Sequence, residues 1–240
     1  MSGRIFLGTS GFAYPEWKGS FYPEDLRDRE MLGYYASRFS SVEINYTFRR
    51  MPSERAIRSW YEQTPSNFVF ALKAPQGITH FARLAGDGSV LREFTATIRP
   101  LGPKLGVLLV QCPPSLPYDP ELLRHFIDGL PTGFRYAMEF RHPSWEAARD
   151  VLSDAGIAWC VAETDEHEAG PVDHGPFAYL RLRRTSYGDS DLDRWAGTVA
   201  GLSAGDRDVF VYFKHEDGAA GPGFAKRLAE RLGLPSITPA

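Results

Sequence analysis

Two glutamates, Glu43 and Glu139, lie within short apolar runs of the chain. A carboxylate that a strand carries into the interior must be paired, or its pKa must shift. One interpretation makes both residues general acid/base groups or metal ligands, with His142 as a third catalytic group shortly after Glu139. The alternative is a structural ion pair with neighbouring lysine or arginine side chains. The residue types alone leave both interpretations open.

Basic side chains outnumber these glutamates in the same parts of the chain. Five of them fall within or directly after apolar runs: Lys73, Arg141, Arg181, Arg183 and Lys214. Guanidinium forks and ammonium groups bind phosphate and other anions through charge-assisted hydrogen bonds. Because the cations exceed the carboxylates that they could neutralise, the sequence predicts a site for an anionic ligand.

Polar and aromatic side chains near the ends of these runs complete the predicted ligand site. The residues assigned to it, besides the basic ones, are Thr9, Ser10, Tyr14, Trp17, Asn45, His80 and Gln111. Gln111 offers a neutral hydrogen-bonding group, and Tyr14 and Trp17 could stack on a nucleobase or a sugar ring. The alternative role of the two aromatic residues is local packing of the loops.

Three histidines also follow predicted strand ends: His80, His142 and His215. Together with the two glutamates they could form a hydrolytic metal centre. Their spacing matches no local metal motif such as His-Glu-x-x-His, and isolated loop histidines more often serve as hydrogen-bonding groups. A divalent metal is therefore not favoured, no residue is assigned as a metal ligand, and the cofactor stays open.

Eight short runs rich in Val, Ile, Phe, Tyr and Leu carry these residues and have the composition of strands. They span residues 4–9, 41–48, 68–74, 105–112, 135–141, 157–163, 177–183 and 208–214. Most intervals between them show apolar residues at helical spacing, and Ser53 and Asp119 are predicted N-caps. The interval 164–176 has no apolar stripe and is too short for a full crossover helix, so a loop is predicted there.

Strands that alternate with helices predict a parallel sheet, and eight of them favour closure into a barrel. Within the strands one alternate set of side chains is apolar, whereas the other becomes polar toward the C-terminal end. In such a barrel the polar set faces the interior and the C-terminal mouth, where these folds keep their sites. We therefore predict an α/β fold, a closed TIM-type (β/α)8 barrel formed by a single domain over residues 1–240.

Five motifs, in order, resemble the YecE-like family (domain of unknown function 72). They are Gly-Thr-Ser-Gly-Phe-Ala-Tyr at 8–14, Val-Glu-Ile-Asn-Tyr-Thr-Phe at 42–48, Lys-Ala-Pro and Ile-Thr-His within 73–80, Gln-Cys-Pro-Pro-Ser at 111–115, and Glu-Phe-Arg-His-Pro-Ser-Trp at 139–145. The resemblance covers nearly the whole chain and implies a TIM-type barrel with polar residues at the strand ends, but no particular reaction. The family usually follows strand eight with Phe-Asn-Asn or Phe-Asn-Asp, whereas this chain has Phe213, Lys214 and His215.

Length and composition narrow the class of protein. The chain has 240 residues, which is close to the size of a (β/α)8 barrel. Its net charge of −3 excludes binding of polyanions through an overall positive charge, but it does not exclude a local basic patch. It shows no membrane-length apolar run, no apolar signal-peptide segment at its start, and two cysteines that form no disulfide framework. We expect a cytoplasmic protein with no membrane partner, and the oligomeric state stays open.

Two classes of function fit these residues. The first is a hydrolase of a phosphodiester or related compound, in which Glu43 and Glu139 transfer protons or hold a metal. The second is a non-catalytic protein that binds nucleic acid or a phosphorylated ligand through the same cations. A glycoside hydrolase is a further alternative, which the cations disfavour because neutral sugars need no such cluster. Every version requires four side chains to converge at one end of the barrel: Glu43, Lys73, Glu139 and Arg183.

Overall fold

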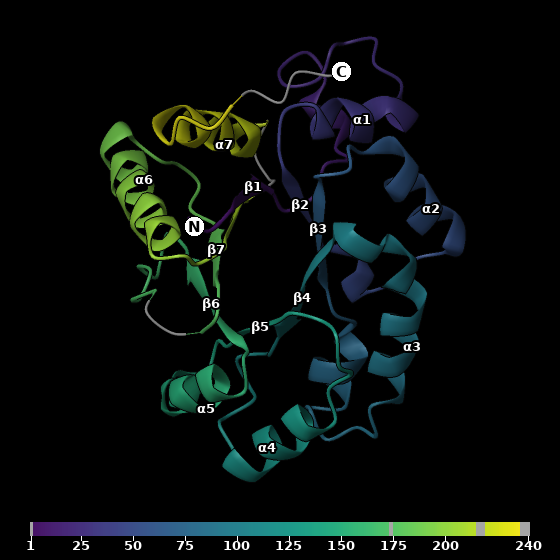
Figure 1. The fold of residues 1–240 in the computed structure, drawn as a ribbon, viewed down its shortest axis with the longest axis vertical. Helices are drawn as coiled ribbons and strands as arrows, with labels where there is room; N and C mark the ends of the chain where they lie inside the picture. The colour runs from purple at the N-terminus through teal and green to yellow at the C-terminus, as the bar shows by residue number, and fades with distance from the viewer. Residues whose placement is uncertain (1, 173–174, 215–218, 236–240) are drawn as a thin grey trace.

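The computed structural model describes residues 2–172, 175–214 and 219–235, and these form a parallel α/β barrel (Figure 1). Its eight strands are β1 (Ile5–Thr9), β2 (Ser41–Ile44), β3 (Val69–Lys73), β4 (Leu105–Gln111), β5 (Tyr136–Glu139), β6 (Ala158–Glu163), β7 (Ala178–Leu182) and β8 (Val209–Phe213). Neighbours are parallel in the order β1-β8-β7-β6-β5-β4-β3-β2. The predicted TIM-type fold is confirmed.

Helices surround the strands on the outside of the barrel (Figure 1). The α-helices are α1 (Met31–Ala36), α2 (Glu54–Gln63), α3 (Ser89–Ile98), α4 (Pro120–Asp128), α5 (Arg149–Asp154), α6 (Asp189–Ala204) and α7 (Ala220–Arg231). Short 3-10 helices cover Pro15–Trp17, Asp28–Glu30, Tyr46–Phe48, Arg99–Lys104 and Pro143–Ala148, and a π-helix covers Gly77–Phe81. None of the helices in the described residues is long and apolar enough to cross a membrane.

The ring of strands is nearly closed, and its seam lies between β1 and β2. These two strands share a single parallel bridge, from Ser10 to Glu43, instead of a continuous ladder. The backbones come so close at Gly8 that an added Cβ would lie 1.9 Å from the carbonyl oxygen of Ser41. The Tyr35 hydroxyl spans the same junction, because it accepts from the Thr9 amide at 2.7 Å and donates to the Ser41 carbonyl at 3.1 Å. Side chains therefore hold the seam where strand pairing is sparse.

Local signals in the sequence account for how several helices begin. The Ser53 hydroxyl accepts from the amide of Ala56 at 3.2 Å, which caps α2 as predicted. The Asp119 carboxylate accepts from the amides of Glu121 and Leu122 at 2.9 and 3.1 Å, and Pro120 occupies the first turn of α4. Both caps satisfy helix donors that have no partner inside the helix.

Three details concern the boundaries and faces of these elements. The second strand ends at Ile44, and Tyr46–Phe48 is a 3-10 helix, so the predicted strand over 41–48 is too long. In α3 the apolar residues Val90, Phe94 and Ile98 recur at helical spacing, which predicts that Val90 lies on the buried face, but Leu91 is buried and Val90 is exposed. Between β6 and β7 the described residues form no helix, in agreement with the predicted loop.

Alternate residues of the strands separate two apolar regions. One cluster, inside the barrel, includes Val69, Ala71, Ala137, Tyr179 and Tyr212. The other lies between the strands and the helices and includes the intervening residues of the same strands. Because side chains alternate along a strand, the next inward positions toward the C-terminal end are occupied by charged residues. The interior phase predicted from the sequence is therefore confirmed.

Candidate functional site at the barrel mouth

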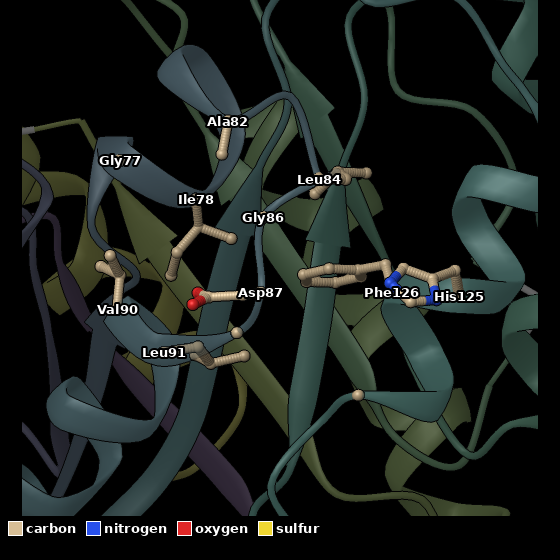
Figure 2. Close-up of a pocket in the computed structure, with 12 residues that line it drawn as sticks. Gly77, Ile78, Ala82, Leu84, Gly86, Asp87, Val90, Leu91, His125 and Phe126 are labelled. Carbon is tan, nitrogen blue, oxygen red and sulfur yellow. The ribbon is translucent and has the colours of Figure 1, made fainter.

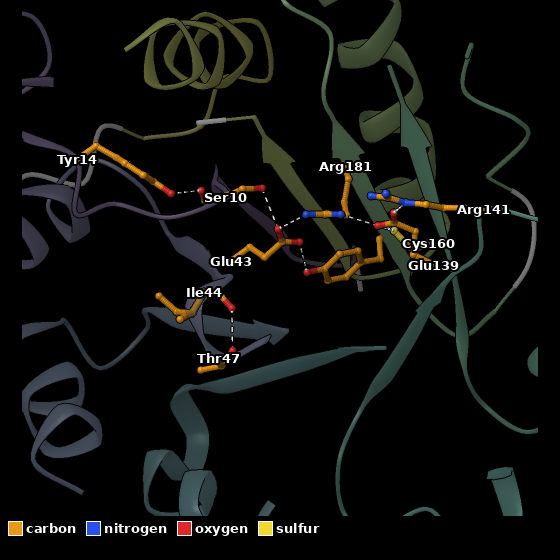
Figure 3. Close-up of polar contacts among 10 residues, drawn as sticks. Ser10, Tyr14, Glu43, Ile44, Thr47, Glu139, Arg141, Cys160 and Arg181 are labelled. Atoms are coloured by element: carbon orange, nitrogen blue, oxygen red, sulfur yellow. Dashed lines mark hydrogen bonds and ion pairs between the residues drawn. The ribbon is translucent and has the colours of Figure 1, made fainter. Parts of the chain in front are cut away.

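Arg181 joins the two predicted glutamates at the top of the barrel interior (Figure 3). Its Nη2 lies 2.8 Å from Glu43 Oε1, and its Nη1 lies 2.5 Å from Glu139 Oε2. All three side chains come from strands, β2, β5 and β7, that are distant in sequence. Glu43 is 0% exposed, and Glu139 and Arg181 are each 2% exposed. The sequence placed these residues together correctly, and the structure shows that they form one buried ion-pair network.

Further hydrogen bonds use the remaining carboxylate oxygens. Glu43 Oε1 also accepts from Ser10 Oγ at 2.8 Å, and its Oε2 accepts from the Tyr179 hydroxyl at 2.8 Å. Glu139 Oε1 accepts from Arg141 Nε at 3.2 Å. Every carboxylate oxygen of the pair therefore has a partner, as buried charges require. Tyr179 was not among the predicted site residues, although it lies two positions before Arg181 and so on the same face of β7.

The electrostatics keep both carboxylates ionised. Burial alone would raise the pKa of Glu139, but the charges of Arg181, Arg141 and Lys73 outweigh it and lower the pKa to about 2. The pKa of Glu43 is likewise lowered, because the Arg181 charge and three hydrogen bonds outweigh the desolvation that would raise it. A general acid needs a pKa near the working pH. The geometry therefore matches the ion-pair interpretation of these glutamates and not that of a proton-transfer pair.

Three further cations surround this network. Arg141 lies two residues after the end of β5, Arg183 directly follows β7, and Lys73 is the last residue of β3. The Lys73 amine lies 4.0 Å from the centre of the Phe48 ring. Burial, then the charge of Arg181, lowers the pKa of Lys73 to about 8 and also lowers the pKa of Arg183. The surroundings of Lys73 and Arg183 therefore destabilise the charged forms of these two side chains.

Several polar groups at this end of the barrel lack protein partners. Among the residues that the structure describes, neither Lys73 nor Arg183 makes a side-chain hydrogen bond or ion pair. The buried Oδ1 of Asn45 has no hydrogen-bond partner. Gln111 is buried beside Glu139 in the β4–β5 register, and within the described residues its side-chain amide makes no hydrogen bond. Together with Arg141, these residues define the mouth site: Asn45, Lys73, Gln111, Arg141 and Arg183.

Three residues predicted to contact a ligand are instead buried. Thr9 is 0% exposed and its hydroxyl donates to the Gly11 carbonyl at 2.7 Å, while Ser10, also 0% exposed, donates to Glu43. Trp17 is 0% exposed and packs against Tyr14 with ring centres 4.8 Å apart. None of the three side chains is accessible in this structure, so nothing here supports their assignment as ligand contacts, which stays a prediction. Thr9 and Ser10 lie at the strand end beside the seam of the barrel, and Trp17 belongs to an aromatic cluster with Tyr14 and Tyr22.

The remaining predicted residues differ in their position. His80 contacts the Phe48 ring, with centres 4.9 Å apart, and burial together with the charges of Lys73 and Arg141 lowers its pKa. His142 instead caps the 3-10 helix Pro143–Ala148, where its Nδ1 accepts from the Ser144 amide at 3.3 Å. The Tyr14 hydroxyl donates to the Ser10 carbonyl at 3.0 Å. Lys214 follows β8 and is partly buried, and its ligand role stays a prediction.

A metal site would require several donor side chains to lie close together. Within residues 2–172, 175–214 and 219–235, no three His, Cys, Asp or Glu side chains form a group that could hold a metal ion. The carboxylate oxygens of the two glutamates accept hydrogen bonds from Arg181, Arg141, Tyr179 and Ser10, so they are not available as metal ligands. His215 lies outside the described residues.

A separate hollow lies beside the barrel, where the π-helix segment faces α4 (Figure 2). Its volume is about 230 Å³, and apolar side chains dominate its lining: Ile78, Ala82, Leu84, Val90, Leu91 and Phe126. Asp87 and His125 also line it, but none of the mouth-site cations does. This cavity is therefore distinct from the mouth site and lacks the charge needed for an anion.

Comparisons with known proteins agree with the fold and the motifs. A family model described as "Protein of unknown function DUF72" matches residues 6–239. The chain is 33% identical over 144 residues to "UPF0759 protein YecE" of Escherichia coli K12, an alignment that covers 60% of this chain and spans only 50% of YecE. It is 22% identical over 275 residues to "UPF0759 protein YunF" of Bacillus subtilis, which covers 96% of this chain and 95% of YunF.

Solved structures show the same architecture. A crystal structure of a DUF72 family protein from Thermotoga maritima superposes with a TM-score of 0.84 and 27% identity, covering 96% of this chain and 99% of that one. A DUF72 family protein from Enterococcus faecalis gives a TM-score of 0.77 at 18% identity, covering 97% and 99%, which shows the fold alone. Since the family model extends across all eight strands and five motifs occur in order, the chain belongs to the DUF72 family.

Proposed function

We propose that the chain binds a phosphate-containing or other small anionic ligand at the mouth site. One observation carries the proposal: two carboxylates face four cations in this cluster, and the carboxylates are already paired. A formal excess of two positive charges remains, counted from Lys73, Arg141, Arg181 and Arg183 against the two glutamates. An anion would offset the mutual repulsion that contributes to the lowered pKa values of Lys73 and Arg183.

The polar groups without protein partners support the same conclusion. Buried polar atoms in proteins are nearly always hydrogen-bonded, so the unpartnered Asn45 Oδ1 calls for a water or a ligand donor. Arg183 offers a planar set of donors that suits phosphate or carboxylate. The Gln111 amide can donate to the same ligand or accept from it. The mouth site thus combines charge with neutral hydrogen-bonding groups.

Binding fits the geometry better than the hydrolytic alternatives. Glu43 has no accessible surface, and both glutamates are held ionised, so neither offers the proton that a glycosidase acid or a phosphodiesterase acid must donate. Lys73 and Arg183 are partly buried at the end of a barrel and do not form a surface stripe. This arrangement favours a small ligand over a nucleic-acid strand, which would track an extended basic groove.

Titration with inorganic phosphate tests the proposal. We expect phosphate to raise the melting temperature of the wild-type protein, relative to chloride at equal ionic strength. Arg183→Gln is expected to weaken binding by about tenfold or more, since a hydrogen bond to a charged group contributes about 1.5–3 kcal/mol. Arg58→Gln, an exposed arginine of α2, is the matched control and should bind as the wild type does.

Failure of phosphate, sulfate and pyruvate to stabilise the wild type at millimolar concentration would contradict the proposal. A short single-stranded oligonucleotide, followed by fluorescence anisotropy, distinguishes the alternative ligand class. If the oligonucleotide binds in an Arg183-dependent manner while phosphate does not bind, the small-ligand assignment is wrong and nucleic acid takes its place.

A further inference from the structure

Lys73 differs from an ordinary buried lysine because no acceptor holds its amine. Lys104 shows the usual arrangement: its Nζ donates to the carbonyl oxygens of Tyr61 and Thr64 at 2.5 and 2.7 Å and to the Thr64 hydroxyl at 3.1 Å. The Lys73 amine instead lies over the Phe48 ring and, among the described residues, makes no hydrogen bond or ion pair. An amine that is not committed to an acceptor is sterically and electronically available for another reaction.

The surroundings of Lys73 increase the neutral fraction of its amine. Its burial and the charge of Arg181, with a smaller effect of Arg141, lower its pKa to about 8, and the charges of Glu43 and Glu139 only partly oppose this. Both glutamates are paired with Arg181, and His80, whose pKa the Lys73 charge helps to lower, does not supply a negative charge. A lysine whose pKa falls toward neutrality has a lone pair available as a nucleophile.

The backbone at Lys73 is held in place. Thr47 Oγ1 donates to the Lys73 carbonyl at 2.7 Å, which ties the end of β3 to the 3-10 helix that carries Phe48. The side chain therefore starts from a rigid strand end, its amine lies over the Phe48 ring, and the charges of Arg181 and Arg141 are close enough to lower its pKa. Rigid placement of this kind is what a nucleophile in a binding site requires.

We propose that Lys73 forms an imine with a carbonyl compound that also carries a carboxylate or phosphate group, and that Arg141 and Arg183 bind this anionic group. The inference rests on the proposed anion site and assigns the ligand class to it. The neutral Nζ adds to the carbonyl carbon, and a proton passes from nitrogen to the carbonyl oxygen. The resulting carbinolamine loses one water molecule, and the carbon–nitrogen double bond forms. The step consumes no oxidant or reductant.

Reductive trapping tests this inference on the whole wild-type protein. The protein is incubated with pyruvate and sodium cyanoborohydride, and peptide mapping by mass spectrometry then locates the reduced adduct. We expect modification of Lys73 to be more than about tenfold faster at pH 7.5 than that of the exposed Lys226, because a lower pKa increases the neutral fraction. The rate at Lys73 should rise with pH to a midpoint near 8, and Lys73→Arg should abolish this adduct while Lys226→Arg should not.

Two further reagents separate this inference from the anion site on which it rests. Methyl pyruvate is the neutral counterpart of pyruvate, and inorganic phosphate is a competitor without a carbonyl. We expect phosphate to slow the reaction of Lys73 with pyruvate and to leave its reaction with methyl pyruvate less affected.

If phosphate binds but Lys73 reacts no faster than Lys226, the imine inference is overturned while the anion site stands. If Lys73 reacts rapidly with methyl pyruvate, shows no preference for pyruvate and is not protected by phosphate, the amine is a nucleophile but the anionic ligand class is overturned, and the proposed function with it. Because the labelled position is mapped on the wild type, these outcomes do not depend on whether a variant folds.

Discussion

Arg181 forms ion pairs with both buried glutamates of the barrel interior. Its guanidinium is buried and donates to one oxygen of Glu43 and one of Glu139. Burial of an isolated carboxylate is very unfavourable, and a buried ion pair that loses one partner leaves such a charge behind. Arg183, two residues later on the same chain, makes no side-chain hydrogen bond or ion pair within the described residues. Two arginines of the same strand end thus have different roles.

Substitution of Arg181→Met is expected to destabilise the protein by about 3–5 kcal/mol, because both glutamates lose their main partner. Urea unfolding at pH 7 measures this loss. Adding Glu43→Gln and Glu139→Gln to the same chain should recover part of it, since the unpaired charges are then removed. Arg183→Gln is the matched control and should change the free energy of unfolding by less than about 1 kcal/mol. Equal losses in the free energy of unfolding for Arg181→Met and Arg183→Gln would show that Arg181 has no special role in stabilising the fold.

The lowered pKa of Glu139 predicts how stability changes in acid. The folded pKa, about 2, lies below the ordinary value of 4.5, so the stabilisation is fully present above about pH 4.5 and is lost as the pH falls toward 2. The contribution is of the order of 3 kcal/mol, from about 1.4 kcal/mol for each pKa unit. Urea unfolding between pH 5 and pH 2 should show a steeper decline for wild type than for Glu139→Gln.

Glu146→Gln provides the control for this pH series, because Glu146 forms an exposed ion pair with Arg149 and should leave the slope unchanged. A wild-type slope equal to that of Glu139→Gln would mean that the carboxylate is not ionised in the folded state below pH 4.5.

Among the elements, the segment between β3 and α3 has an irregular backbone. It contains the π-helix Gly77–Phe81, followed by Arg83 and Leu84, two non-glycine residues with positive φ angles of 50° and 65°. Such conformations persist only where the surroundings hold them, and they concentrate at functional sites. Here Arg83 is tied to the Ser115 carbonyl at 2.8 Å, while the π-helix brings His80 to the mouth site. Phe81, the last residue of the π-helix, is 74% exposed.

The helix α4 illustrates an element whose start is specified locally. Asp119→Ala should destabilise the protein by about 1 kcal/mol, because two amides of the first turn lose their acceptor. Thermal or urea unfolding measures the effect, and Asp119→Asn, which keeps an acceptor oxygen, should retain most of the stability. Phosphate binding at the mouth site should not change in either variant, and a change there would mean that the two regions are coupled.

At the scale of the whole molecule, closure of the barrel depends on the seam between β1 and β2. The two strands share one bridge, and the Ser10–Glu43 hydrogen bond connects the seam directly to the Arg181 network. The close approach of Gly8 to Ser41 leaves no room for a side chain. Charge neutralisation inside the barrel and closure of its wall are therefore linked through Glu43.

Gly8→Ala is expected to destabilise the protein by about 3 kcal/mol or more, because the added methyl group overlaps the Ser41 carbonyl and must push the strands apart. Hydrogen exchange should show faster exchange of the amides of β1 and β2 than of those of β5 and β6. Gly201→Ala is the control: the position is exposed in α6 and has nothing within 4 Å, so this change should stabilise by about 0.5–1 kcal/mol. Unchanged exchange at the seam in Gly8→Ala would contradict the closure described above.

Much of this architecture could be predicted from the sequence because its determinants are local. The alternation of side chains along each strand identified the inward set, and Ser53 and Asp119 marked helix starts through hydrogen bonds that span two or three residues. Local patterns were less reliable where neighbouring elements compete for the same residue. Leu91, and not Val90, lies on the buried face of α3. Trp17 is buried in an aromatic cluster and does not lie exposed at the mouth.

The sequence by itself determined that the chain is a barrel of eight strands and that Glu43, Glu139 and the basic residues share its C-terminal end. Only the tertiary structure decided how these charges are paired. Arg181 and Glu43 are 138 positions apart, so their 2.8 Å contact depends on strand order and register around the whole barrel. The physical reason is that the energy of an ion pair changes strongly when the two charges move a few ångströms apart, whereas sequence patterns specify only the face and the end of a strand on which a residue lies. That pairing occupies both carboxylates, whereas Lys73 and Arg183 make no side-chain ion pair within the described residues, and we propose that they bind the ligand.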